Sequence, residues 1–120
     1  MHLHHAIDYI EICVGDLAAA TRFYGQAFGW AFNEYGPAYA GIRKQDGEIG
    51  GLRQVEGYKG EGGGPLVILF SEDLQASLAA VEDAGGVVVE PPFEFPGGRR
   101  FHFSDPSGNV LGVWAEATSP

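Results

Sequence analysis

Hydrophobic residues alternate with polar ones near the start of the chain and then change to a helical spacing. The alternation predicts a strand over Ala6–Val14 that buries one face. The helical spacing begins after Asp16, whose carboxylate can accept hydrogen bonds from the free amides of a first helical turn. It ends at Gly29, a residue type that commonly terminates helices. We therefore expect a strand and then a helix whose aromatic side chains belong to the core.

After this helix the hydrophobic period returns to two. Gly36-Pro37 and Gln45-Asp46-Gly47 are typical of turns between neighbouring strands. The expected strands are Ala31–Glu34, Ala38–Arg43 and Ile49–Val55. The pair Gly50-Gly51 inside the last strand indicates a bulge or a close approach of another backbone. The first half of the chain thus reads strand, helix, strand, strand, strand.

The second half repeats that order. Its first expected elements are a strand over Leu66–Phe70, a helix opened by Asp73 and closed by Gly85-Gly86, and a strand over Val87–Glu90. Pro91-Pro92 is expected to end this strand, because proline cannot donate to a strand ladder. Phe93–Gly98 is then expected to be a loop. The last element is a hairpin over Phe101–Trp114 that turns at Asp105–Asn109.

One constant offset relates the two halves and carries Asp16 to Asp73. We therefore predict an α+β fold of two βαβββ modules that form a curved, barrel-like mixed sheet with helices outside. All of residues 1–120 are expected to form a single domain. Its parts are a first module at about 7–55, a glycine-rich linker at 56–65 and a second module at about 66–116.

Composition limits the classes of partner. The chain has 120 residues, of which 45% are hydrophobic, so it can bury a core of its own. Seven basic residues against sixteen acidic ones give a net charge of −9, which argues against nucleic acids and anionic membranes. Cys13 is the only cysteine, so no internal disulfide can form, and no apolar run reaches membrane-spanning length. We expect a soluble cytoplasmic protein.

Five short motifs occur in a specific order along the chain. They are VGDL at Val14–Leu17, FYGQAFGW at Phe23–Trp30, IGG at Ile49–Gly51, SEDL at Ser71–Leu74 and FHFSDPSGNVLGVWAE at Phe101–Glu116. Together they resemble the vicinal oxygen chelate superfamily, which includes glyoxalase I, bleomycin-resistance proteins and extradiol dioxygenases. The most similar part of it is the lactoylglutathione lyase-related group. The resemblance implies paired βαβββ modules around a barrel-like cavity and a homodimer.

The resemblance also implies where a divalent metal would bind. The family's metal enzymes hold it with His, Gln or Glu from the first and last strands of each module. The matching positions here are Tyr9, Val55, Leu66 or Val67, and Gly112. None is a usual metal ligand, and a register slip would replace Val55 only by Gln54 or Glu56, whereas a catalytic site needs about three protein ligands. We predict no cofactor, keep a divalent metal as the alternative, and leave open whether the chain is an enzyme.

Strand alternation predicts which side chains line the family's cavity. They are Tyr9, Glu11, Cys13, Tyr39, Arg43, Gln54, His102, Gly112 and Trp114. The predicted function is binding of an unidentified small molecule without metal. One alternative is a metal-dependent lyase or isomerase of the lactoylglutathione lyase type. Others are a protein that sequesters bleomycin-type antibiotics and a purely structural dimer whose cavity is filled by aromatic side chains.

Two features of this set bear on the charge of the ligand. Glu11 is either a solvated carboxylate on an open sheet face or a pocket residue. In a pocket it favours a cationic ligand, unless Arg43 or Arg100 pairs with it. Arg100 and His102 share a face of their strand, where they either bind a ligand carboxylate or pair with surface acids. The sequence leaves both pairs of alternatives open.

Overall fold

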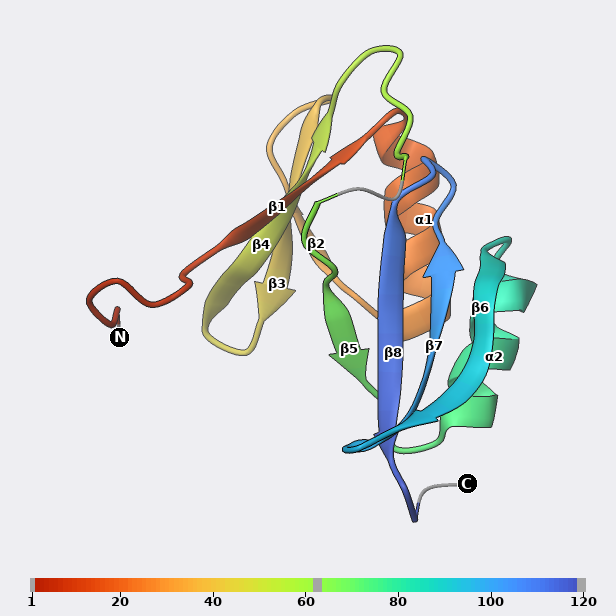
Figure 1. Cartoon of the computed structure of the whole chain (residues 1–120). Helices are drawn as coiled ribbons and strands as arrows, with labels where there is room; N and C mark the ends of the chain where they lie inside the picture. The colour runs from red at the N-terminus through yellow and green to blue at the C-terminus, as the bar shows by residue number, and fades with distance from the viewer. Residues whose placement is uncertain (1, 62–63, 119–120) are drawn as a thin grey trace.

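The structure, a computed structural model, describes residues 2–61 and 64–118 (Figure 1). The first module consists of β1 (Ile10–Val14), α1 (Leu17–Phe28), β2 (Phe32–Glu34), β3 (Tyr39–Lys44) and β4 (Gly47–Gln54). The second consists of β5 (Ile68–Phe70), α2 (Leu74–Asp83), β6 (Val87–Phe95), β7 (Gly98–Ser104) and β8 (Val110–Glu116). The predicted order of strand, helix, strand, strand, strand therefore occurs twice.

Each module forms its own four-stranded mixed sheet. The strand order is β1-β4-β3-β2 in the first sheet and β5-β8-β7-β6 in the second. In both sheets the first and last strands of the module pair in parallel, and the other neighbours are antiparallel. The predicted α+β fold of two βαβββ modules is confirmed. Within the described residues its curved wall consists of two sheets that do not close into a barrel.

Both helices begin at the aspartates that the sequence indicated. Asp16 accepts a hydrogen bond from the Ala19 amide at 3.0 Å, and Asp73 accepts one from the Ala76 amide at 3.1 Å. Gly29 ends α1 in the left-handed conformation, with a φ of 73°. No helix in the described part of the chain is long and apolar enough to cross a membrane.

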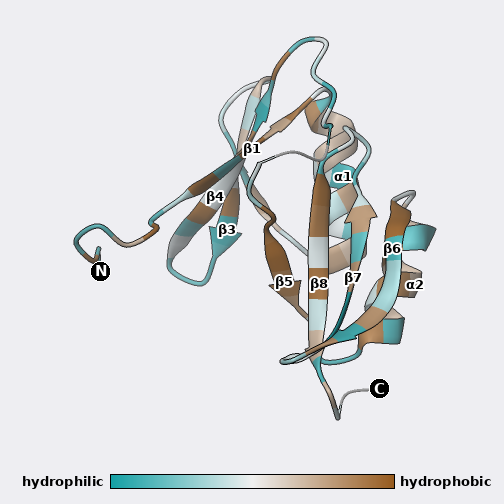
Figure 2. Cartoon of the chain, viewed as in Figure 1, coloured by the Kyte–Doolittle hydropathy of each residue, from teal (hydrophilic) through white to brown (hydrophobic). Residues whose placement is uncertain are grey.

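The aromatic side chains of α1 join the two modules. Phe23 and Phe28 pack on Phe103 of β7, with ring centroids 5.9 and 5.6 Å apart. Tyr24 is buried and stacks on Trp30 at 4.5 Å. Figure 1 shows α1 and α2 on the same side of β7 and β8, and Figure 2 shows hydrophobic residues along β5 and β8. The predicted place of these aromatic residues in the core is confirmed.

β6 differs from the prediction. The strand continues through Pro91-Pro92 to Phe95, so the expected strand end at Glu90 and the expected loop over Phe93–Gly98 are wrong. β6 is an edge strand of the second sheet, and its pairing with β7 shifts register on both sides of Glu90. A strand tolerates proline at an edge or an irregularity, because the missing amide is not needed there. The extension places two more aromatic side chains on the second sheet.

The turn between β7 and β8, Asp105–Asn109, ties the modules together and is called the Asp105 turn below. The carboxyl group of Asp105 is buried and accepts hydrogen bonds from Tyr24 Oη at 2.8 Å and from the Ser107 and Asn109 amides at 2.8 and 2.9 Å. Asn109 Nδ2 donates to the Cys13 carbonyl at 2.7 Å. The predicted turn therefore also positions α1 and β1.

Candidate functional site

Each sheet has one face packed against the helices and one face that points away from them, its open face. On the open face of the first sheet, the Tyr9 and Tyr39 hydroxyl oxygens lie 2.6 Å apart. The Glu48 carboxylate accepts hydrogen bonds from Tyr35, from Asn33 at 2.9 Å and from Tyr9 at 3.4 Å. These side chains are hydrogen-bonded to one another, and we call the set of Tyr9, Asn33, Tyr35, Tyr39 and Glu48 the tyrosine network.

The tyrosine network lies on two glycines. A Cβ atom at Gly51 would lie 2.0 Å from Tyr39 Oη, and one at Gly41 would lie 2.1 Å from a Glu48 oxygen. The hydrogen bond from Tyr35 is the main cause of a lowered pKa at Glu48, and burial is the main cause of a raised pKa at Tyr39. At neutral pH the Glu48 carboxylate is therefore ionised and the Tyr39 phenol, like that of Tyr35, is protonated, which keeps their hydrogen bonds intact.

Glu11 is paired within the protein. Its carboxylate lies 2.9 Å from Arg53 Nε, and Arg53 Nη2 also lies 3.4 Å from Cys13 Sγ. The cation is therefore Arg53, not the alternatives Arg43 and Arg100. The argument for a cationic ligand needs an unpaired Glu11 carboxylate, and this ion pair removes that condition.

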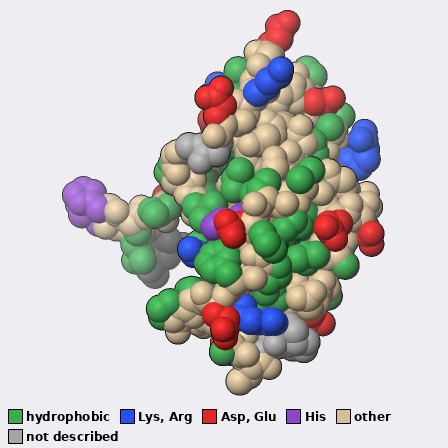
Figure 3. Space-filling view, turned by 45° about the vertical axis from the view of Figure 1, so that its right-hand side comes forward, with side chains coloured by type: hydrophobic (Ala, Val, Ile, Leu, Met, Phe, Trp, Pro, Cys, Tyr) green, Lys and Arg blue, Asp and Glu red, His purple; other side chains and the backbone are tan. Residues whose placement is uncertain are grey.

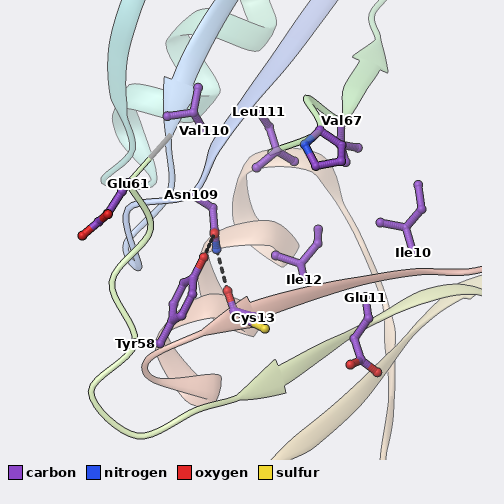
Figure 4. A pocket seen from close by; sticks show the side chains of 11 residues that line it. Ile10, Glu11, Ile12, Cys13, Tyr58, Glu61, Val67, Asn109, Val110 and Leu111 are labelled. Carbon is purple, nitrogen blue, oxygen red and sulfur yellow. Dashed lines mark hydrogen bonds between the residues drawn. The ribbon is translucent and has the colours of Figure 1, made fainter. Parts of the chain in front are cut away.

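A cleft of about 260 Å³ lies between β1 and the Asp105 turn (Figure 4). Ile12 and Leu111 point toward each other across it, whereas Glu11 points to the other side of β1. Tyr58 donates to Asn109 Oδ1 at 2.7 Å at one end of the cleft. Tyr58 and Asn109 are hydrogen-bonded to each other at this end, so we assign the cleft to the contact between the two modules.

The open face of the second sheet is aromatic. Trp114 lies between Phe70 and Phe95, with ring centroids 5.1 and 6.2 Å away. Arg100 is paired with Trp114 across the β7–β8 ladder, and its guanidinium carbon lies 5.2 Å from the Phe93 ring and 5.1 Å from the Phe95 ring. A hollow of about 290 Å³ on this face is lined by Ile68, Phe95, Gly97, Arg100 and Trp114.

Two polar atoms on this face have no partner. Arg100 Nε and His102 Nε2 are buried and make no hydrogen bond within the described part of the chain. The His102 ring meets Phe93 edge to face at 5.6 Å and faces Gly112 on β8. Burial, and then the charge of Arg100, lower the pKa of His102, against the opposing charge of Glu90. Buried polar atoms without a partner are rare, so these two are candidates for ligand contacts.

We call this set the aromatic face: Phe70, Phe93, Phe95, Arg100, His102 and Trp114. Figure 3 shows one side of the molecule on which hydrophobic side chains gather toward the middle, while most acidic and basic side chains lie toward the margin. Trp114 and His102 are each partly exposed, so this face is open to a ligand.

The remaining predicted site residues lie elsewhere. Gln54 Oε1 accepts a hydrogen bond from the Leu17 amide at 2.7 Å, so it serves the first turn of α1. Arg43 borders a separate apolar groove of about 320 Å³ between the first sheet and β5. The nine predicted residues therefore divide among several places. The first sheet holds Tyr9, Glu11, Cys13 and Tyr39, and the aromatic face or its floor holds His102, Gly112 and Trp114.

Sequence reasoning placed only His102 and Trp114 of the aromatic face in the site. Phe70 ends an expected strand without a site role, Phe93 and Phe95 fall in the expected loop, and Arg100 has two open interpretations. The available signal is the alternation of Phe93, Glu94 and Phe95, which has the period of a strand. Pro91-Pro92, which precede these residues, argue against a strand unless that strand lies at the edge of a sheet. The sequence alone does not show that β6 is an edge strand.

Strand pairing gives a second set of equivalent positions in the two modules, beside the set that the resemblance implies. Gly112 pairs with Ile68 in the second sheet, and Glu11 pairs with Gly51 in the first. The offset that carries Asp16 to Asp73 also carries Glu11 to Ile68. The paired set is therefore Glu11, Gly51, Ile68 and Gly112, whereas the resemblance implies Tyr9, Val55, Leu66 or Val67, and Gly112. Val55 follows the end of β4 and pairs with none of them.

These residues do not fit a catalytic metal. Glu11 alone offers an oxygen ligand, and it pairs with Arg53. A Cβ atom at Gly112 would already lie 3.2 Å from His102 Cδ2, which leaves little room for a longer side chain. Among residues 2–61 and 64–118, no group of three or more His, Cys, Asp or Glu side chains could hold a metal ion.

Comparison with known proteins agrees with the topology. A model of the Glyoxalase/Bleomycin resistance protein/Dioxygenase superfamily matches residues 6–113. The chain belongs to this superfamily. The curated relatives include "Putative glyoxylase CFP32" of Mycobacterium bovis, 24% identical over 115 residues that cover 89% of this chain and 44% of the relative. The chain thus spans less than half the length of the curated relatives it matches.

Several solved structures share the fold. One is a glyoxalase-related enzyme from Fulvimarina pelagi, with a TM-score of 0.79 and 23% identity, covering 97% of this chain and 91% of that one. Another is TnmS3, an antibiotic binding protein from Streptomyces sp. CB03234, with a TM-score of 0.69 and 24% identity, covering 96% and 99%. The superfamily fold therefore carries both an enzyme and a binding protein among these neighbours.

Proposed function

We propose that this protein binds a small molecule with a flat apolar part on the aromatic face, and that binding needs no metal. The observation that carries the proposal is the hollow of about 290 Å³ beside Trp114, between Phe95 and Ile68. Concave sites lined by aromatic side chains and a few polar groups are the usual form of small-molecule sites. On the open face of the first sheet, by contrast, the tyrosine hydroxyls and the Glu48 carboxylate are hydrogen-bonded to one another.

Two further observations support binding without metal. The paired set of equivalent positions holds two glycines, an isoleucine and a glutamate that is paired with arginine, and the set that the resemblance implies holds no usual metal ligand. TnmS3, a neighbour of the same fold, is an antibiotic binding protein. The glyoxalase type of lyase or isomerase is the alternative, and it requires a metal that these residues do not hold.

The test uses a neutral aromatic probe. ¹⁵N-labelled protein, dialysed against a chelator, is titrated with 2-naphthamide while the indole N–H resonances of Trp114 and Trp30 are followed. Trp114 is partly exposed on the aromatic face, whereas Trp30 stacks on Tyr24 in the core and serves as an internal control. We expect saturable shifts at Trp114 and none at Trp30.

Two variants separate the faces. Trp114→Ala lacks the reporter indole, so its affinity is measured by isothermal titration calorimetry beside the parent; 2-naphthamide binding should weaken by about fivefold or more, since an aromatic contact of this kind is worth about 1 kcal/mol beyond its buried area. Tyr35→Ala removes an exposed aromatic ring from the first sheet and should leave the affinity unchanged. Shifts confined to the first sheet, or stoichiometric Zn, Ni, Fe or Mn retained through dialysis, would contradict the proposal.

A further inference from the structure

The two unpartnered polar atoms of the aromatic face lie side by side on one strand. Arg100 and His102 are two residues apart on β7, so their side chains leave the same face of the sheet. Arg100 pairs with Trp114 across the ladder and His102 pairs with Gly112. Arg100 therefore lines the hollow beside Trp114, and His102 lies next to Arg100 on the same face of β7.

We infer that the ligand carries an anionic group, a carboxylate or a similar planar oxyanion, that Arg100 and His102 bind. This inference rests on the proposed function and names its ligand class. A carboxylate supplies acceptors for two parallel hydrogen bonds from a guanidinium group and for one from an imidazole. The apolar part of the same ligand would lie against Trp114.

The surroundings hold the Arg100 guanidinium in place before a ligand arrives. Its carbon lies 5.2 and 5.1 Å from the Phe93 and Phe95 rings. Two aromatic contacts restrict the long side chain, so less freedom is lost when it binds an anion.

No carboxylate of the described chain takes these donors. Glu90 of β6 is opposite His102 in the ladder and is the nearest candidate, but it is exposed and forms no ion pair or hydrogen bond with His102 or Arg100 within the described residues. This contrasts with the first sheet, where Glu11 and Arg53 pair at 2.9 Å. Although the net charge is −9, no acidic side chain of the described residues forms an ion pair with Arg100 on the aromatic face.

Gly112 allows His102 and Ile68 to pack closely on β8. The glycine faces His102, and a Cβ atom there would lie 3.2 Å from His102 Cδ2 and 3.4 Å from Ile68 Cγ1. The missing Cβ atom therefore allows the imidazole to lie close against β8, on the sheet face that also carries Arg100.

The test compares two probes of nearly the same shape. 2-Naphthoate is anionic at neutral pH and 2-naphthamide is neutral, and each is titrated while the Trp114 indole resonance is followed. We expect naphthoate to bind at least about tenfold more tightly, as for a hydrogen bond to a charged group. Arg100→Gln should abolish this preference, and His102→Phe should reduce it. Arg53→Gln, on the first sheet, should leave it unchanged.

The pH profile adds a second readout. Arg100 and Glu90 are the charged groups that face His102, and the imidazole is neutral before binding. A bound anion favours the imidazolium, so the preference for naphthoate should increase as the pH falls from about 8 to about 6. The His102→Phe variant should show no such increase.

The outcomes separate the inference from the proposed function. Equal affinities of the parent protein for naphthoate and naphthamide at Trp114 would overturn the anionic ligand and leave the proposed function standing. A preference that survives in Arg100→Gln would overturn the role of Arg100. Absence of any Trp114 shift with either probe would overturn both proposals.

Discussion

The β7–β8 hairpin carries two sets of buried polar groups with opposite hydrogen bonding. At the Asp105 turn, the Asp105 carboxyl accepts from a tyrosine hydroxyl and two backbone amides within 2.9 Å. A few residues earlier on the same hairpin, Arg100 Nε and His102 Nε2 have no partner in the described chain. Both sets lie among aromatic side chains, so burial alone does not distinguish them.

This difference distinguishes polar groups that stabilise the fold from polar groups that we propose to bind a ligand. A buried polar group stabilises the folded state only when it is hydrogen-bonded, and it destabilises that state when it is not. The Asp105 turn therefore contributes to stability. The unpartnered atoms of Arg100 and His102 do not add to the stability of the folded state. In our proposal these two residues serve ligand binding. Substitutions in the two sets should accordingly have opposite signatures.

The largest effect is expected from Asp105→Ala. The change leaves the Tyr24 hydroxyl and the Ser107 and Asn109 amides without their acceptor. We expect the free energy of unfolding to fall by about 3 kcal/mol or more, measured by urea denaturation. Asp46→Ala, in the exposed turn between β3 and β4, is the matched control and should change it by less than about 0.5 kcal/mol. If Asp105→Ala and Asp46→Ala lower the free energy of unfolding equally, the Asp105 turn does not stabilise the fold in the way described.

A smaller loss is expected from Tyr24→Phe. The substitution keeps the ring that stacks on Trp30 and removes only the hydroxyl that donates to Asp105 at 2.8 Å. The free energy of unfolding should decrease by about 1.5–3 kcal/mol, the range for a hydrogen bond to a charged group. Naphthoate affinity of the folded variant should stay the same. A change in that affinity would mean that the turn and the aromatic face are coupled.

Arg100→Met should show the opposite signature. Methionine keeps much of the length and apolar contact of the side chain while it removes the charge and the unpartnered donor. The loss of two cation–π contacts and the loss of a buried charge partly offset each other, so stability should change by less than about 1 kcal/mol. Binding of 2-naphthoate should weaken at least about tenfold in the same sample, to the affinity of 2-naphthamide. A fall in stability as large as that of Asp105→Ala would assign Arg100 to the fold.

The smallest effect is the contribution of His102 to the pH dependence of stability. Its pKa is lowered in the folded state, chiefly by burial, so the unfolded state binds more protons as the pH falls through the ordinary histidine range. The contribution is complete above the unfolded pKa of about 6.5 and is lost below it. The stability of the parent should therefore fall more between about pH 7.5 and 5.5 than that of His102→Phe. Parallel profiles would show that the His102 pKa is not lowered.

The sequence by itself determined the modular plan of this protein. Alternating and helical spacings, with aspartates at both helix starts, predicted two βαβββ modules, and the aromatic residues of α1 were correctly expected in the core. These features depend on residues near one another in the chain, where backbone geometry and capping act directly. The motif at the Asp105 turn likewise predicted a turn from local chemistry alone.

Only the tertiary structure decided which residues form the candidate site. The constant offset between the modules holds for the first strands and the helices but fails for the last strands. On the last strand of the first module, Gly51 is the residue that pairs with Glu11, whereas Val55 lies beyond the end of β4. β6 continues through its prolines because it is an edge strand. Arg53, and not Arg100, pairs with Glu11. Each of these results depends on contacts between segments that are distant in sequence. The pattern of residues within one segment does not determine such contacts.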